Sequence, residues 1–235
     1  MSNWEVKLKG DDVFLKELAQ EYVEPEISVT FHKEGYFLKS EEFNQLGERS
    51  ELFEKAGNIL EFINASSKVF ANKLGAVEPD GFWVVDSNGE RKEELFGVGI
   101  ASVQFQNILM DIGVAPKEWY QIWKSNEAVK YVFRLLLSET LLDWFSLFKI
   151  YETIRDDDGH LSASRKGIEK IESWTSVEQN KIFHKTANWH RHTVFGKSKG
   201  KVNEKPLIEM TLSEGNNYIL GLTKVWLVEK AKQTP

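Results

Sequence analysis

The chain has 235 residues, a formal net charge of −6 at pH 7 and no cysteine. Hydrophobic residues make up 41 % and charged residues 28 % of it, proportions typical of a soluble globular protein with one large or two modest domains. The absence of cysteine excludes disulfides, thiolate metal sites and cysteine nucleophiles. The sequence begins without an apolar signal core, and charged residues interrupt its most apolar helical stretch, so we expect a cytoplasmic protein with no membrane partner.

The charge of the chain changes sign near Pro116. Residues 1–116 contain 11 basic and 21 acidic side chains, a net charge of −10, whereas residues 117–235 contain 19 and 15, a net charge of +4. We therefore predict two domains, an acidic one over 1–116 and a basic one over 117–235, each with different partners.

The acidic half has the residue pattern of a mixed α/β structure. Alternating or clustered apolar residues predict strands at 4–8, 27–31, 36–38, 82–85 and near 95–105. Apolar residues at helical spacing predict helices at 11–18 and 52–63. This order favours a mixed or antiparallel sheet with helices on one face, and an α+β class for the chain.

The basic half has the spacing of amphipathic helices. The expected helices cover residues 118–123, 129–155, 168–184 and 212–230. Thr211 and Glu214 have the spacing of a capping box at the start of the last one. This half is therefore predicted to form a helical bundle.

The most basic segment of the chain is 181–205, with seven cations and one anion. Lys197, Lys199 and Lys201 stand among glycines and polar residues, which predicts an exposed loop that can contact phosphate groups without reading bases. The alternative is a solvated linker between two helices.

Asn188, Arg191 and His192 form a polar cluster in the same segment. Arginine supplies a planar fork for phosphate, and imidazole exchanges protons near neutral pH. His190 and His192 could share a metal ion on an extended backbone, with His184 or an acid as a third ligand. Because no third ligand is fixed by the spacing, hydrogen-bonding histidines at a helix end are favoured, and we predict no metal and no cofactor.

A second cluster, Arg155 to His160, follows the expected long helix. Arg155 stands three residues after Glu152, so these two side chains are expected to pair on one helical face. The three aspartates that follow Arg155 oppose the dipole at a helix C-terminus, so a nearby group should compensate them. The alternative for this cluster is an exposed acidic turn.

Arg155-Asp156-x3-His160 resembles the motif of HEPN domains, small helical bundles common in bacterial toxin and phage-defence systems. The resemblance implies metal-independent RNA cleavage, in which the histidine handles protons, the arginine stabilises phosphate charge, and a homodimer completes the site. This chain departs from the pattern because two further helices are expected after the motif. Asn188, Arg191 and His192 lie nearer the expected position but lack the spacing.

Most of the chain also resembles a group of bacterial proteins to which no activity is assigned. The shared residues lie in the basic half and are Phe183, Ala187, Asn188, Arg191, His192, Pro206, Met210, Thr211, Leu212, Glu214, Trp226 and Leu227. The spacing between Asn188 and Arg191 is shorter here than in that group. This resemblance implies a cytoplasmic bacterial protein.

Two hypotheses of different class follow. The first is a protein that binds RNA or nucleotide phosphate, in catalytic form a HEPN-like ribonuclease that uses Arg155 and His160, or Arg191 and His192 beside Asn188, with Lys197, Lys199 and Lys201 holding the backbone. The second is a non-catalytic interaction protein of a bacterial accessory system, whose acidic half docks a protein partner.

Overall fold

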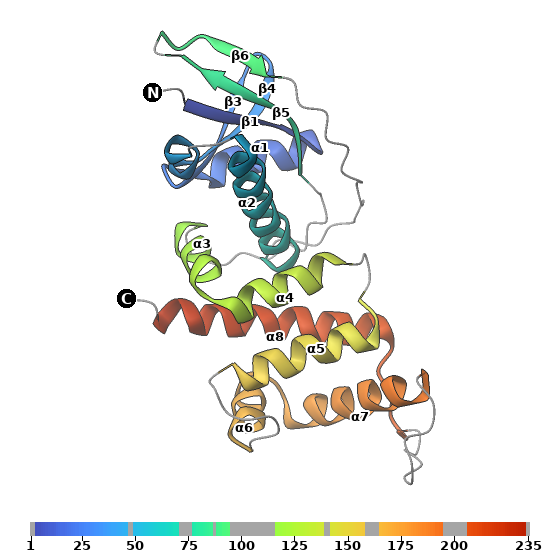
Figure 1. Ribbon diagram of the computed structural model, residues 1–235. Coiled ribbons are helices and arrows are strands. Elements are labelled where there is room, and N and C mark those ends of the chain that lie inside the picture. Colours follow the sequence, from blue (N-terminus) through green and yellow to red (C-terminus); the bar gives the residue numbers. More distant parts are fainter. Residues whose placement is uncertain are drawn as a thin grey trace. The chain divides into compact units, whose positions relative to one another are not determined.

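The computed structural model describes residues 3–46, 49–70, 77–86, 88–94, 116–138, 142–157, 165–194 and 206–233. The chain forms two compact units, Met1–Trp123 and Lys124–Pro235. The predicted α+β class is confirmed, because an antiparallel sheet with helices is followed along the chain by further helices (Figure 1).

The first unit contains a six-stranded sheet in the described residues, with strand order β2-β3-β4-β1-β5-β6 and antiparallel pairing throughout. Its strands are β1 (Asn3–Lys9), β2 (Val23–Glu24), β3 (Ile27–His32), β4 (Gly35–Lys39), β5 (Glu78–Val85) and β6 (Arg91–Glu94). The sheet is thus antiparallel rather than mixed. The strand predicted near 95–105 lies outside the described residues.

Helices α1 (Asp12–Glu21) and α2 (Arg49–Phe70) lie on the same side of the sheet (Figure 1), with the short 3-10 helix η1 (Glu41–Gln45) between them in sequence. Phe53 of α2 packs on Phe82 of β5, with ring centroids 4.3 Å apart. Helix α3 (Pro116–Ser125) begins at the residue where the charge of the sequence changes sign. Its Tyr120 and Trp123 pack against Phe62 of α2, so aromatic rings hold α3 to the first unit.

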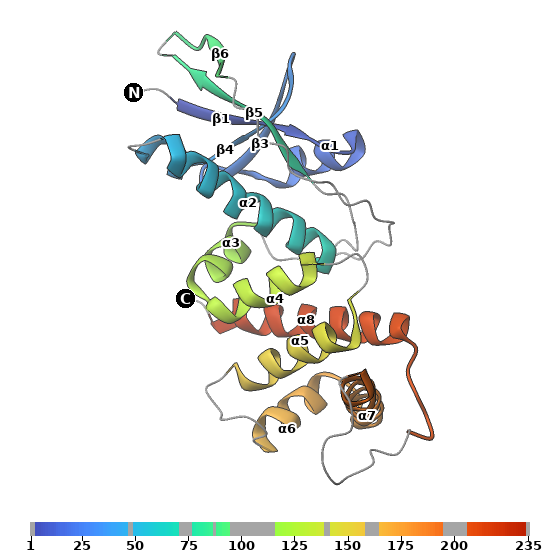
Figure 2. The same cartoon turned by 45° about the vertical axis from the view of Figure 1, so that its right-hand side comes forward.

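The second unit is made of helices, as predicted for this part of the chain. They are α4 (Glu127–Ser138), α5 (Trp144–Asp156), α6 (Arg165–Trp174), α7 (Val177–Val194) and α8 (Leu212–Gln233). Helix α5 is central, lying between α8 on one side and α6 and α7 on the other (Figures 1 and 2). The side chains of Leu147, Ile150 and Ile154 on this helix are fully buried.

The prediction of one long helix over 129–155 is wrong, because α4 ends at Ser138 and α5 begins at Trp144. The Asp143 carboxylate caps α5 by accepting a 2.7 Å hydrogen bond from the Ser146 amide. The Asn216 side chain on α8 accepts from the Leu142 amide at 3.2 Å and donates to the Leu142 carbonyl at 3.0 Å. A side chain distant in sequence therefore satisfies the backbone at this break.

The prediction of one helix over 168–184 is wrong, because α6 ends at Trp174 and α7 begins at Val177. Helix α7 extends ten residues beyond the predicted end at about 184, so Asn188, Arg191 and His192 are helical. The capping box at the start of α8 is confirmed. The Glu214 carboxylate accepts from the Thr211 amide at 2.7 Å, and the Thr211 hydroxyl accepts from the Glu214 amide at 3.2 Å. Helix α7 thus ends at Val194, and the capping box fixes the start of α8.

Candidate phosphate-binding site

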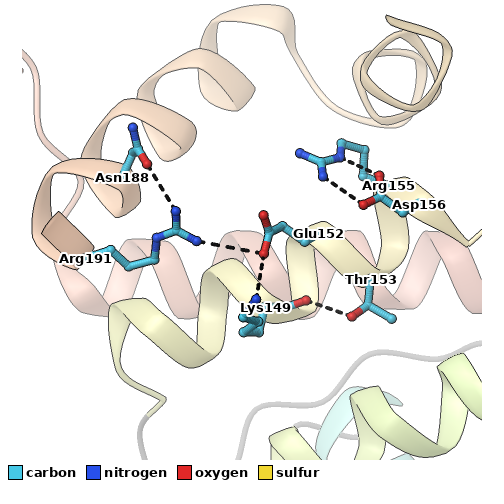
Figure 3. A network of polar contacts seen from close by, with 7 residues as sticks. All are labelled: Lys149, Glu152, Thr153, Arg155, Asp156, Asn188 and Arg191. Carbon is cyan, nitrogen blue, oxygen red and sulfur yellow. Dashed lines mark hydrogen bonds and ion pairs between the residues drawn. The ribbon is translucent and has the colours of Figure 1, made fainter. Parts of the chain in front are cut away.

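Polar side chains from α5 and α7 meet on the face where these two helices pack together (Figure 3). The Glu152 carboxylate of α5 accepts a 3.1 Å hydrogen bond from the Lys149 ammonium. The same carboxylate lies 3.8 Å from Nη1 of Arg191 on α7. The Asn188 side-chain oxygen accepts a 3.3 Å hydrogen bond from Nη2 of Arg191. Asn188 and Arg191, both predicted site residues, are therefore in contact.

The Arg191 guanidinium lies over the ring of Phe148, with its carbon 3.8 Å from the ring centroid. This cation–π contact restricts the plane of the guanidinium. An arginine carries five N–H donors, and within the described residues those of Arg191 make only the long contacts to Asn188 and Glu152. The side chain of Arg191 is 19 % exposed. It is thus held in place by its stacked face, and most of its donors make no hydrogen bond to a described residue.

Arg155 is placed differently, because two of its donors form short hydrogen bonds to one carboxylate. Its Nε and Nη2 atoms donate to the two carboxylate oxygens of Asp156, at 2.7 and 2.8 Å. The side chain is 7 % exposed, and hydrogen bonding to Asp156 raises the pKa of Arg155. The prediction that Arg155 pairs with Glu152 is wrong as to its hydrogen-bond partner, since Glu152 instead bonds Lys149 and faces Arg191.

Helix α6 approaches Arg155 closely at Gly167. A Cβ atom at Gly167 would lie 2.5 Å from the Arg155 carbonyl oxygen and 2.8 Å from its Cγ. Only glycine fits at this distance, so α6 covers the arginine from one side. The bidentate pair with Asp156 satisfies a guanidinium that is shielded from water. In this arrangement two of the Arg155 donors are engaged by Asp156.

The charges of both arginines act on His184 of α7, a residue that the sequence suggested only as a third metal ligand. Burial lowers the pKa of His184, and the positive charges of Arg155 and Arg191 lower it further. The centroid of its ring lies 5.5 Å from that of Phe148 and 6.1 Å from that of Tyr151. The sequence signal was available: positions 184, 188 and 191 follow the i, i+4, i+7 spacing of one helical face.

His190 and His192, the histidines next to Arg191 in sequence, do not join this cluster. The His190 ring stacks on Trp144 at 5.2 Å, and its Nε2 lies 2.6 Å from a carboxylate oxygen of Glu209. His192 is exposed near the end of α7. Because the backbone is helical rather than extended, positions 190 and 192 point to different sides of α7. No cluster of three or more metal-ligating side chains occurs in the described part of the chain.

The acidic turn after α5 has the compensating group that the sequence required. The Asp157 carboxylate accepts a 2.8 Å hydrogen bond from Nε1 of Trp226 and forms an ion pair with the Lys230 ammonium at 2.5 Å. Its side chain is 4 % exposed, so the alternative of an exposed turn is wrong for Asp157. Lys230 stands in the last turns of α8. This contact ties the end of α5 to α8.

The remaining predicted residues lie outside the described part of the chain: His160, Lys197, Lys199 and Lys201. The pairing of Arg155 with His160 therefore stays a prediction.

None of the described helices is long and apolar enough to cross a membrane.

In comparisons with known proteins, the chain matches no protein-family model, no curated protein and no solved structure.

Proposed function

We propose that the helical unit binds phosphate groups of RNA or nucleotides, with Arg191 as the anchor. The observation that supports this is a guanidinium held flat against Phe148, partly open to solvent, with most of its donors unspent on described residues. A planar fork of this kind suits the bidentate recognition of phosphate oxygens. Lys149 adds a second positive charge from α5.

A phosphate group that binds Arg191 must replace the contact of Arg191 with Glu152. Its carboxylate lies 3.1 Å from the Lys149 ammonium but 3.8 Å from Arg191, so the contact with Arg191 is the weaker one. A phosphate group that reaches Arg191 replaces this long ion pair with charge-assisted hydrogen bonds of about 2.8 Å. Lys197, Lys199 and Lys201 belong to the same proposal, as non-specific contacts to neighbouring phosphates.

Metal-independent cleavage of RNA is the catalytic form of this proposal. His184 favours it, because burial and two nearby arginines lower its pKa and keep the imidazole neutral at pH 7. A neutral imidazole accepts a proton from a ribose hydroxyl, while a guanidinium stabilises charge on the phosphate. In this form His184 replaces His192 as the proton-handling residue beside Arg191, and His160 remains the candidate beside Arg155.

The competing function is a non-catalytic interaction protein. Two contacts favour it: the bidentate pair of Arg155 with Asp156 keeps both charges within α5, and the contact of Asp157 with Lys230 joins the end of α5 to α8. In this alternative the acidic first unit docks a protein partner.

Binding is tested by fluorescence anisotropy with a labelled single-stranded RNA of about 20 nucleotides, over a series of salt concentrations. Arg191→Ala is expected to weaken binding about tenfold, the loss of a charge-assisted bidentate contact. Lys185→Ala is the matched control, because Lys185 is exposed on the same helix and its loss changes the net charge equally. Equal affinities for both variants would reject Arg191 as the anchor.

Cleavage is tested on total RNA in the presence of a chelator, with wild type, His184→Ala, His160→Ala and His192→Ala side by side. The catalytic form predicts that His184→Ala removes the products while His192→Ala retains them. If RNA binds but all four proteins give identical background products, the protein is a binding module. If RNA neither binds nor is cleaved, the interaction protein remains.

A further inference from the structure

A hollow opens in the helical unit on a different side of α7 from the candidate phosphate-binding site. It has a volume of about 650 Å³ and is bordered by the turn between α6 and α7, by α7, by residues 208–210 and by α8. Cavities of about 300 to 1,000 Å³ are typical of small-molecule sites. The residues of the Arg191 cluster do not line it.

The walls of the hollow combine apolar and aromatic side chains with a few polar ones. Ile182 lines it from α7, and Leu222 and Val225 from α8, while Trp174 and Tyr218 contribute rings. One face of the Tyr218 ring packs on Phe183, with centroids 4.8 Å apart. This fixed ring and the aliphatic walls suit the apolar body of a ligand.

The charged groups in the lining are both carboxylates, Glu209 and Glu214, and no lysine, arginine or histidine is among the described residues that border the hollow. Oε2 of Glu214 accepts from the Thr211 amide and hydroxyl, and these hydrogen bonds lower the pKa of Glu214. The carboxylate is therefore ionised at neutral pH. The start of α8 contributes about half an elementary positive charge, which one carboxylate already outweighs.

We propose that this hollow binds a small organic cation, an amine or guanidinium attached to an aromatic or branched aliphatic body. The cationic group pairs with Glu214, next to Glu209, whose carboxylate also contacts Nε2 of His190. The body packs against Tyr218, Leu222 and Val225. The sign of the charge distinguishes this ligand from the phosphate ligand of the Arg191 cluster. The two proposals are independent, and either can fail without the other.

Gly221 of α8 provides a way to close the hollow. It lines the cavity, and a Cβ atom built on it would meet no heavy atom within 4 Å. A side chain at 221 therefore extends into the hollow without displacing the backbone. Gly57 of α2 is the matched control, because a Cβ atom there also meets nothing within 4 Å and α2 belongs to the first unit.

The test uses isothermal titration calorimetry with three indoles of similar size: tryptamine, which is a cation, tryptophol, which is neutral, and indole-3-propionate, which is an anion. Tryptamine is expected to bind about fivefold more tightly than tryptophol, as for a partly exposed ion pair, and indole-3-propionate more weakly than both. Gly221→Leu should abolish the binding of tryptamine, and Gly57→Leu should leave it unchanged.

Glu214→Gln separates charge from shape. Glutamine preserves a capping box, so α8 keeps its start. The variant should reduce the preference for tryptamine over tryptophol by about threefold while the affinity for tryptophol stays the same. Three results would overturn the proposal: no binding of tryptamine, equal binding of all three indoles, or binding that Gly221→Leu leaves intact.

Discussion

Removing the Asp157 carboxylate is expected to separate the end of α5 from α8. This carboxylate accepts a 2.8 Å hydrogen bond from Nε1 of Trp226 and forms an ion pair with the Lys230 ammonium at 2.5 Å. Trp226 is fully buried, and the side chain of Asp157 is 4 % exposed. In Asp157→Ala the indole N–H therefore loses its acceptor in a place that water does not readily reach.

The expected cost follows from those two contacts. Leaving a buried N–H unsatisfied and losing a charge-assisted hydrogen bond should together destabilise the helical unit by about 3 kcal/mol. Asp157→Asn keeps an oxygen for Trp226 but loses the charge that faces Lys230, so it should cost about 1 kcal/mol. Glu229→Ala is the control on α8, since its exposed pair with Lys232 should contribute about 0.5 kcal/mol or less.

Urea denaturation followed by far-UV circular dichroism measures these differences, and equal m-values across the variants show that the same surface is exposed on unfolding. The expected order of stability is wild type and Glu229→Ala, then Asp157→Asn, then Asp157→Ala. If Asp157→Ala is no less stable than Glu229→Ala, the contact with Trp226 and Lys230 does not hold the helices together.

Three further predictions concern single side chains of the helical unit. In α8, Gly215→Ala should destabilise the protein by about 1 to 3 kcal/mol, because its Cβ would lie 2.7 Å from the Trp144 ring. Gly221→Ala should stabilise the protein by about 0.5 to 1 kcal/mol, because its Cβ meets no atom within 4 Å. Thermal unfolding checks this pair, since the two variants should shift Tm in opposite directions. Asn216→Ala should cost about 1 to 3 kcal/mol in urea denaturation, because two backbone groups between α4 and α5 lose their partner. The pKa of His184 is lowered in the folded protein, so the unfolded chain takes up its proton first and stability should fall as pH drops below about 6.5. His184→Gln should reduce this loss between pH 7.5 and 5.5, and an unchanged slope would contradict it.

Local signals predicted the elements whose stability depends on neighbours in sequence. The alternation in β1 predicted a half-buried strand, because successive side chains of a strand point to opposite faces. Val6 and Leu8 are buried as this predicts. Glu5 on the polar face is buried too, however, paired with Lys39 and Arg91. The capping box of Thr211 and Glu214 was predicted for the same reason, since both residues act within one helical turn.

The break between α4 and α5 could not be predicted in this way. The apolar positions on both sides continue one helical period, and the Asn216 side chain, 74 residues away in sequence, satisfies the backbone of Leu142. The partner of Arg155 was missed for a related reason. Helical spacing pointed to Glu152, but packing brings Arg191 of α7 to that carboxylate, and Gly167 brings α6 against Arg155.

The sequence alone therefore determined the α+β class, most helices and strands, and the need for a positive partner near the aspartates after α5. Tertiary structure decided which charges are available for a ligand. Arg155 and Arg191 are both arginines on amphipathic helices, yet one is buried in a bidentate pair and the other lies partly open on an aromatic ring. Burial and partner distance depend on how helices pack, and no local pattern contains that information.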